Sequence, residues 1–230
     1  MAASLPSLSA NDRVSIFGGT GSGKSVFAHY LYRRIPENRG WWKVIIDVTN
    51  SIDDPFALPL LPYQQIPWDK GWNFHFVPDL MGDLEAQVNF VYLECFRHGL
   101  VTIWLDEGNE VSTAHHTVRA VRTVNLQGRK NLTGQIMATP RPADISVSFF
   151  SQAQLVIVFN LATENDRKRV AGNFGMSLAE FDEEMFALPQ YGYLMYEVTT
   201  HRLWRMPPLP KDIVNRLTAV SSVSRNVSAA

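Results

Sequence analysis

The sequence predicts a single α/β domain in which a mainly parallel central sheet is flanked by helices on both faces and followed by a β-hairpin near the C-terminus. Three observations lead to this class. Apolar segments with the spacing of strands alternate along the chain with segments that have the spacing of helices. A glycine-rich turn joins the first predicted strand to the first predicted helix. The length of 230 residues has room for one sizeable core and not for two large domains.

The first half of the chain alternates strands and helices. "RVSIFGG", which begins at Arg13, predicts a strand, and "KSVFAHYLYRRI" after the turn predicts a helix because its apolar residues recur at helical spacing. The next strands are expected over Lys43–Asp47 and Asn73–Val77. The proline-rich stretch between them, "DDPFALPLLPYQQIPWDKG", is expected to be an irregular loop. "GDLEAQVNFVYLECFRHGL" then predicts a helix.

The second half continues the alternation and ends in a hairpin. "VTIWLDE" predicts a buried strand, "STAHHTVRAVRTVNLQGRKN" a helix that ends in a basic turn, and "TGQIMAT" a strand that must stop before Pro140. "QLVIVFNL" predicts a further strand, "ENDRKRVAGNF" and "SLAEFDEEMF" two helices, and "YGYLMYEV" with "HRLWRM" a hairpin that turns at Thr199 and Thr200. From Thr218 the sequence is polar and small, which predicts a mobile tail. The expected division is an N-terminal extension (1–12), a main domain (13–217) and the tail (218–230).

Composition and charge set few limits on function. Hydrophobic residues make up 46% and charged residues 19% of the chain, as in ordinary folded proteins. The formal net charge of -1 neither favours nor excludes a nucleic-acid partner, because a local basic patch can be hidden by the average. Cys95, the single cysteine, is expected to be buried in a helix. No stretch reaches the roughly 18 apolar residues of a membrane span, so we expect a cytoplasmic protein without membrane insertion.

The glycine-rich turn "GGTGSGKS" matches the phosphate-binding pattern G-x-x-x-x-G-K-[ST] and lies between a strand and a helix, as that motif requires. Glycines let backbone N–H groups surround phosphate oxygens at a helix N-terminus. Lys24 is expected to reach the β- and γ-phosphates of ATP, and the Ser25 hydroxyl to coordinate Mg²⁺. The expected nucleotide contacts are Gly18, Gly19, Thr20, Gly21, Ser22, Gly23, Lys24, Ser25 and Val26.

The two carboxylates that end "VTIWLDE" complete such a site. A P-loop enzyme needs an acidic residue at the end of a neighbouring buried strand, and Asp106 supplies it as a second contact to Mg²⁺. Glu107 is expected to orient and activate water, which favours hydrolysis over transfer to a second substrate; the alternative is a solvated acid at a strand end. Glu110 is a less favoured base. His115 and His116 are interpreted as a surface or interface feature, because adjacent residues cannot share one helical face.

Several segments around this site resemble one family of P-loop ATPases. "GRKNLTGQIMATPRPADIS" resembles the segment of FtsK/HerA-type DNA-pumping ATPases in which a basic turn enters a strand that ends in Ala-Thr-Gln-Arg-Pro. "SQAQLVIVFNLATENDRKRV" and "VIIDVTNS", which contains Asp47, resemble further strands of that family. The resemblance extends from Arg13 to Arg205. Because the chain is short and lacks the added domains of cellular translocases, it is most similar to the genome-packaging ATPases of icosahedral viruses with an internal membrane, of the tectivirus type.

The resemblance implies a RecA-like P-loop NTPase fold and a homo-oligomeric ring, expected to be a hexamer. Such a ring threads double-stranded DNA, without sequence specificity, into a preformed capsid at the expense of ATP. The implied partners are other copies of the chain and proteins of the capsid vertex or of the membrane-associated vertex. The implied location is the host cytoplasm or the packaging vertex of the virion.

Two site residues follow only from this resemblance. The arginine finger, which reaches the nucleotide of a neighbouring subunit, falls on Arg129; Arg122, Lys130 and a merely solvated basic turn remain alternatives. The family has a glutamine that senses the γ-phosphate where this chain has Pro140, which has no donor to offer. Thr139 is therefore the expected substitute. Asn160, at the end of the following strand, is a second candidate.

DNA contacts and competing functions remain open at this point. Two basic clusters could bind DNA phosphates or be solvated helix faces: Arg33, Arg34 and Arg39, and Arg167, Lys168 and Arg169. Alternative functions are a P-loop ATPase for the assembly or secretion of filamentous phage, another DNA-pumping ATPase of a mobile element, a small-molecule kinase, and a nucleotide-bound structural module.

Overall fold

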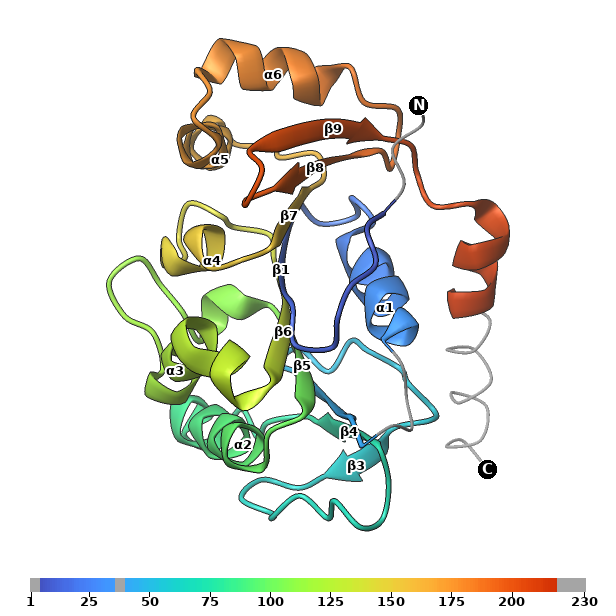
Figure 1. Cartoon of the computed structure of the whole chain (residues 1–230), viewed down its shortest axis with the longest axis vertical. Coiled ribbons are helices and arrows are strands. Elements are labelled where there is room, and N and C mark those ends of the chain that lie inside the picture. Colours follow the sequence, from blue (N-terminus) through green and yellow to red (C-terminus); the bar gives the residue numbers. More distant parts are fainter. Residues whose placement is uncertain (1–4, 36–39, 219–230) are drawn as a thin grey trace.

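The computed structural model describes residues 5–35 and 40–218. Its described residues form one sheet of nine strands in the order β3-β4-β2-β5-β6-β1-β7-β8-β9 (Figure 1). Strands β1 to β7 run parallel, and β8 and β9 are antiparallel additions at one edge. The strands are β1 (Arg13–Phe17), β2 (Trp42–Asp47), β3 (Leu58–Leu60), β4 (Asn73–Phe76), β5 (Val101–Asp106), β6 (Thr133–Thr139), β7 (Leu155–Val158), β8 (Tyr193–Glu197) and β9 (Arg202–Met206).

Helices cover both faces of this sheet, but unevenly. One face carries α1 and a helix over residues 211–218, and the other carries the remaining α-helices (Figure 1). The helices are α1 (Lys24–Arg34), α2 (Leu84–His98), α3 (Arg119–Gln127), α4 (Ser148–Ser151), α5 (Glu164–Phe174) and α6 (Leu178–Phe186), with short 3-10 turns η1 (Gly108–Glu110) and η2 (Gly128–Asn131).

The two cores follow from the alternation of side chains along the central strands. In β1, Val14 and Ile16 pack toward α1, whereas Phe17 packs into the larger core on the opposite face. In β5, Trp104 lies in the α1 core and its neighbours Ile103 and Leu105 lie in the other. Strands that are buried on both faces read as continuous apolar runs, which is why they were recognisable in the sequence.

The mainly parallel sheet, the alternating helices and the C-terminal hairpin are confirmed. The prediction of an irregular loop between the second and third expected strands was wrong in part, because this stretch contains β3. Pro59 is tolerated there since β3 is the edge strand and pairs only with β4. The helices over 148–151 and 211–218 were not predicted. Residues 219–230, most of the predicted tail, lie outside the described residues, as do residues 1–4.

The helix expected from "STAHHTVRAVRTVNLQGRKN" is shorter than predicted and begins at Arg119. A bridge between Ser112 and Thr117 closes a small loop before it. The Thr113 hydroxyl accepts hydrogen bonds from the backbone N–H groups of His115 and His116, a local pairing that competes with helix formation. The two histidines therefore lie on an exposed loop and not on a helix.

The segment before β1 packs against the domain. Leu5, Leu8 and Ala10 contact the core on the α1 face. The backbone of this segment crosses β6 so closely that a Cβ at Gly134 would meet the Ala10 carbonyl oxygen. Among the described residues, no helix is long and apolar enough to cross a membrane.

Candidate nucleotide-binding site

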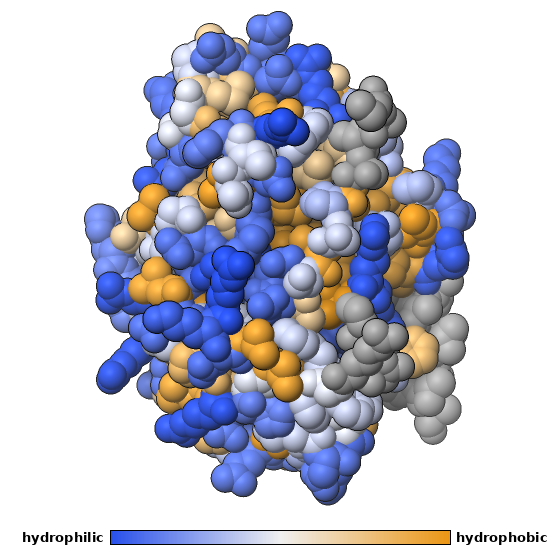
Figure 2. Space-filling view, viewed as in Figure 1, coloured by the Kyte–Doolittle hydropathy of each residue, from blue (hydrophilic) through white to orange (hydrophobic). Residues whose placement is uncertain are grey.

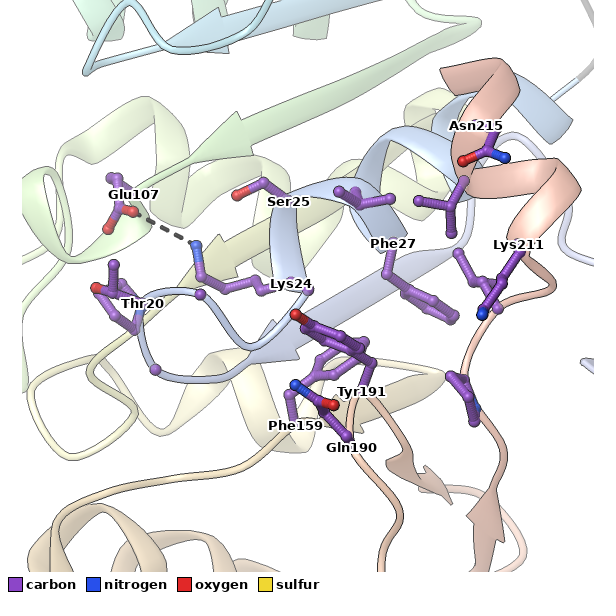
Figure 3. A pocket seen from close by; sticks show the side chains of 18 residues that line it. Thr20, Lys24, Ser25, Phe27, Glu107, Phe159, Gln190, Tyr191, Lys211 and Asn215 are labelled. Carbon is purple, nitrogen blue, oxygen red and sulfur yellow. Dashed lines mark hydrogen bonds and ion pairs between the residues drawn. The ribbon is translucent and has the colours of Figure 1, made fainter. Parts of the chain in front are cut away.

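The carboxyl ends of β1, β5, β6 and β7 meet at one edge of the sheet, and the glycine-rich turn lies there. It follows β1 and ends at the first turn of α1 (Figure 3). Gly23 has a φ of 99°, a left-handed conformation that side chains rarely adopt. A Cβ at Gly18 would lie 2.6 Å from the Phe159 Cβ. The sequence thus places glycine where the turn needs both conformational freedom and close approach.

Lys24 and Glu107 face each other at the head of this turn. The Lys24 Nζ lies 3.4 Å from the Glu107 Oε1, and both side chains are largely shielded from solvent (Figure 3). Glu107 has a φ of 54°, so a non-glycine residue holds a left-handed backbone conformation directly after the strand. Strain of this kind persists mainly at functional sites. The geometry places the predicted catalytic carboxylate beside the predicted phosphate-binding lysine.

Asp106 is buried at the end of β5, and its Oδ1 has no hydrogen-bond partner among the described residues. Burial raises the pKa of this carboxyl to about 6, although Lys24 acts in the opposite direction; the charges of Glu107 and Asp47 raise it further. A buried carboxylate oxygen without a donor is the kind of group that a divalent cation satisfies. Ser25, at the start of α1, follows Lys24, whose charge is close enough to Asp106 to act on its pKa. Asp106 and Ser25 fit the oxygen-ligand pair expected for Mg²⁺.

Asp47 lies directly beside Asp106 in the register of β2 and β5, yet its environment differs. Its carboxylate accepts hydrogen bonds from the backbone N–H groups of Ser51 and Ile52, at 3.0 and 2.7 Å. The His75 ring lies 3.3 Å away. Asp47 is therefore satisfied by the protein itself, whereas Asp106 is not.

Thr139 ends β6 as predicted, but its hydroxyl is already engaged. It donates to the Asn109 Oδ1 at 2.8 Å, and the N–H of Arg141 points back to it. Pro140, and not Thr139, lines the cavity. Asn109, which follows Glu107 in η1, was not singled out from the sequence. The Asn160 carbonyl oxygen accepts from the Gly19 N–H at 3.0 Å and so anchors the glycine-rich turn to the end of β7.

Arg129 lies near the amino ends of the parallel strands, opposite the glycine-rich turn. It belongs to η2, which precedes β6, whereas the cavity follows the carboxyl end of that strand. Strand β6 rises roughly 20 Å between the two, which is beyond the reach of an arginine side chain. Arg129 is close enough to Arg13 to lower the pKa of that guanidinium, although burial is the larger cause.

The basic clusters considered for DNA are partly neutralised within the chain. Arg33 lies 2.7 Å from the buried carboxylate of Asp54. In the second cluster, Arg167 lies 2.7 Å from Asp182. Arg39 lies outside the described residues. Of the exposed histidines, His116 pairs with Glu85 at 3.0 Å.

A cavity of about 850 Å³ extends from the glycine-rich turn past the start of α1 (Figure 3). Much of its wall is formed by residues that the sequence gave no reason to connect with the site: Tyr191 beside the turn, and Leu209 and Val214 in the C-terminal segment. A second hollow of about 440 Å³ lies against the turn on the side of Asn160 and Met185.

Known proteins resemble this chain in sequence and in fold. No protein-family model matches the sequence. The chain is 23% identical over 212 residues to the DNA packaging ATPase P9 of Enterobacteria phage PRD1, an alignment that covers 86% of this chain and 87% of P9. The genome packaging NTPase B204 from Sulfolobus turreted icosahedral virus 2, in complex with AMPPCP, superposes with a TM-score of 0.70 at 21% identity, covering 87% of this chain and 99% of B204.

A more distant solved structure shares the same fold. The cytoplasmic domain of the type VII secretion ATPase EccC from Thermomonospora curvata superposes with a TM-score of 0.56 at 12% identity, covering 86% of this chain and 24% of EccC. The predicted P-loop ATPase fold is confirmed, as is the resemblance to viral genome-packaging ATPases.

Proposed function

We propose that this chain is an ATPase that drives double-stranded DNA into a preformed viral capsid. One observation carries the chemistry: the fold brings Lys24, Ser25 and Glu107 to one cavity, with Glu107 held in a strained conformation and the adjacent Asp106 buried with one oxygen unsatisfied. That hydrolysis drives DNA packaging is inferred from similarity to P9, a DNA packaging ATPase, and to B204, a genome packaging NTPase.

In this proposal the chain's own groups divide the reaction among them. Backbone N–H groups of the glycine-rich turn bind the phosphates, and Lys24 pairs with the β- and γ-phosphate oxygens. Ser25 and Asp106 would hold Mg²⁺, which when bound neutralises charge on the phosphates. Phosphate oxygens compete with Glu107 for Lys24, so nucleotide binding frees this carboxylate to orient water for attack on the γ-phosphate.

A ring of subunits would bring Arg129 to the nucleotide of a neighbouring copy. Because Arg129 lies at the opposite end of β6 from the nucleotide cavity of its own chain, it can stabilise γ-phosphate charge only in a neighbouring copy of the chain. We propose a homo-oligomeric ring, expected to be a hexamer, with DNA phosphates contacted in its centre and a capsid vertex protein as its docking partner. It would act in the host cytoplasm and at the packaging vertex of the virion.

Thr139 is proposed to act on phosphate through its neighbour. Its hydroxyl donates to the Asn109 side chain, and Asn109 follows Glu107 after a single residue. A change in the position of Glu107 on hydrolysis would pass through Asn109 to the end of β6. This role differs from direct contact between Thr139 and the γ-phosphate.

The test is ATP hydrolysis by the purified ring with and without blunt double-stranded DNA. DNA is expected to stimulate turnover, and Glu107→Gln to lower kcat by about 10²- to 10⁴-fold while leaving ATP binding intact. The matched control is Glu183→Gln, which removes one charge from an exposed side chain outside the cavity. Turnover in assembled rings that is indifferent to DNA would refute the packaging function.

A further inference from the structure

We propose that the nucleoside of the bound nucleotide occupies a subsite between Tyr191 and the C-terminal segment 207–215, an inference that rests on the proposed ATPase function. The subsite assigns ligand contacts to residues far from the glycine-rich turn in sequence. It also makes the helix over residues 211–218 part of the nucleotide site.

The cavity changes character along its length. Its first end presents the backbone of the glycine-rich turn with Lys24 and Ser25, groups that suit phosphate. The rest of its lining is mainly apolar and aromatic, with Phe159 and Tyr191 beside the turn and Val26, Phe27, Leu209 and Val214 completing the wall. A volume of about 850 Å³ is ample for a small-molecule ligand, since such sites span about 300 to 1,000 Å³. A nucleoside triphosphate has the same order, polar phosphates followed by a flat ring.

Tyr191 occupies its position at a conformational disadvantage. It has a φ of 61° in the turn closed by the Gly192 N–H and the Pro189 carbonyl oxygen at 2.8 Å. Glycine or asparagine is favoured at such a position. Tyr191 is 53% exposed, so burial of its ring does not offset the free-energy cost of the left-handed conformation. A strained aromatic residue that remains exposed beside a cavity suggests a ligand as its partner.

The ring lies against the phosphate-binding turn. A Cβ built at Gly23 would be 3.5 Å from the Tyr191 Cδ1, and Figure 3 shows the ring just below the turn and beside Phe159. Phe159 packs edge-on against Phe27 and is itself buried, so it forms a fixed floor. A base placed past the phosphates would meet the face or edge of Tyr191 first.

The opposite wall is one face of the C-terminal helix. Lys211, Val214 and Asn215 line the cavity, and their spacing of three and four residues places them on one side of a helix. Leu209, which precedes this helix, packs against the core under α1. On the visible face, apolar surface gathers around α1 and continues toward the helix (Figure 2). Val214 offers an apolar contact, and Lys211 and Asn215 offer hydrogen-bond donors at its margins.

A ligand that touches both the turn and this helix must couple them. ATP would hold the helix against the domain, whereas a ligand that consists of phosphates alone would fill only the first end of the cavity. Nucleotide occupancy would therefore determine how firmly residues 211–218 are docked.

The first test compares AMPPNP with inorganic tripolyphosphate, each with Mg²⁺, by titration calorimetry. Tyr191→Ala is expected to weaken AMPPNP binding about 3- to 10-fold and to leave tripolyphosphate binding unchanged, while Tyr191→Phe retains both. Val214→Asp should show the same selectivity. The matched control is Tyr63→Ala, since Tyr63 is 54% exposed with a φ of 59° but lies outside the cavity.

The second test is hydrogen exchange of the unmodified chain. Amides of residues 211–218 should exchange more slowly with AMPPNP than with tripolyphosphate at equal saturation. Full AMPPNP affinity in Tyr191→Ala and Val214→Asp would overturn the subsite and leave the ATPase proposal standing. Equal loss of both ligands would overturn it too, because Tyr191 would then shape the turn. Failure of the parent chain to bind either ligand would refute the ATPase proposal itself, and the subsite with it.

Discussion

Replacing Asp106 with asparagine is expected to stabilise the nucleotide-free protein while removing its response to Mg²⁺ and ATP. The folded protein holds the pKa of this carboxyl at about 6, compared with an ordinary value of 3.8. A carboxyl with a raised pKa binds its proton more tightly in the folded state. Its contribution to the free energy of unfolding is therefore greatest at acid pH and is lost as the pH rises from about 4 through 6.

The size of the effect follows from the shift. One pKa unit corresponds to about 1.4 kcal/mol, so a charged Asp106 at pH 7.5 opposes folding by at most about 3 kcal/mol. Asparagine removes the charge but brings an amide with few acceptors, which costs about 1 to 2 kcal/mol. The net gain should be about 1 to 2 kcal/mol, or about 2 to 6 °C in Tm.

The assay is urea unfolding at pH 5 and pH 7.5 with EDTA and without nucleotide. At pH 5 the folded carboxyl is mostly protonated while the unfolded one is still ionised, so the opposition to folding falls to about half. This is about equal to the cost of the amide, and Asp106→Asn should therefore give no net gain at pH 5. Asp47→Asn is the contrasting variant: its carboxylate accepts two backbone hydrogen bonds, and the substitution should destabilise the chain by about 1 to 2 kcal/mol. A loss of stability in Asp106→Asn that is equal at both pH values would refute this account of the buried charge.

Two further predictions concern communication around the site. Glu107→Gln and Arg129→Ala subunits should each be inactive alone, and an equal mixture should recover up to about a quarter of parental activity if the arginine acts on a neighbouring copy. An equal loss in every mixture would contradict that role. Thr139→Val and Asn109→Ala should lower kcat by similar factors, and the double variant should be no worse than either, because both break one hydrogen bond. Additive losses in the steady-state rate would show that the two residues act separately.

The first end of the cavity could be predicted from the sequence because its chemistry imposes residue types at fixed spacing. Phosphate binding needs glycines and a lysine in one short turn, and Lys24 stands where that pattern requires. Carboxyl ends of parallel strands share an edge, so a strand that ends in Asp106 and Glu107 had to meet the turn. Here the sequence motif and the strand topology both predict that these residues lie at one site.

The apolar wall of the cavity could not be predicted, because apolar contacts with a ligand impose no residue spacing. Tyr191 precedes a strand, and its sequence context, "YGYL", indicates only the start of a hairpin. The helix over 211–218 left a weak signal: Pro210 before it, Asp212 in its first turn, and Ile213, Val214 and Leu217 at helical spacing. That pattern is half exposed, and the helix is placed by contacts with the domain more than by its own periodicity.

Three unfavourable features lie in this cavity or directly beside it. Glu107 and Tyr191 line the cavity and hold left-handed conformations, and Asp106, the residue before Glu107, is buried with an unsatisfied oxygen. The same conformation also occurs away from the cavity, as at Leu132, where it caps η2 and turns the chain into β6, and at Tyr63. What distinguishes Tyr191 is its position, because its turn presents an exposed ring to the cavity. Because Asp106 would hold Mg²⁺ while Glu107 and Tyr191 face the nucleotide, binding should stabilise the folded chain at these three residues.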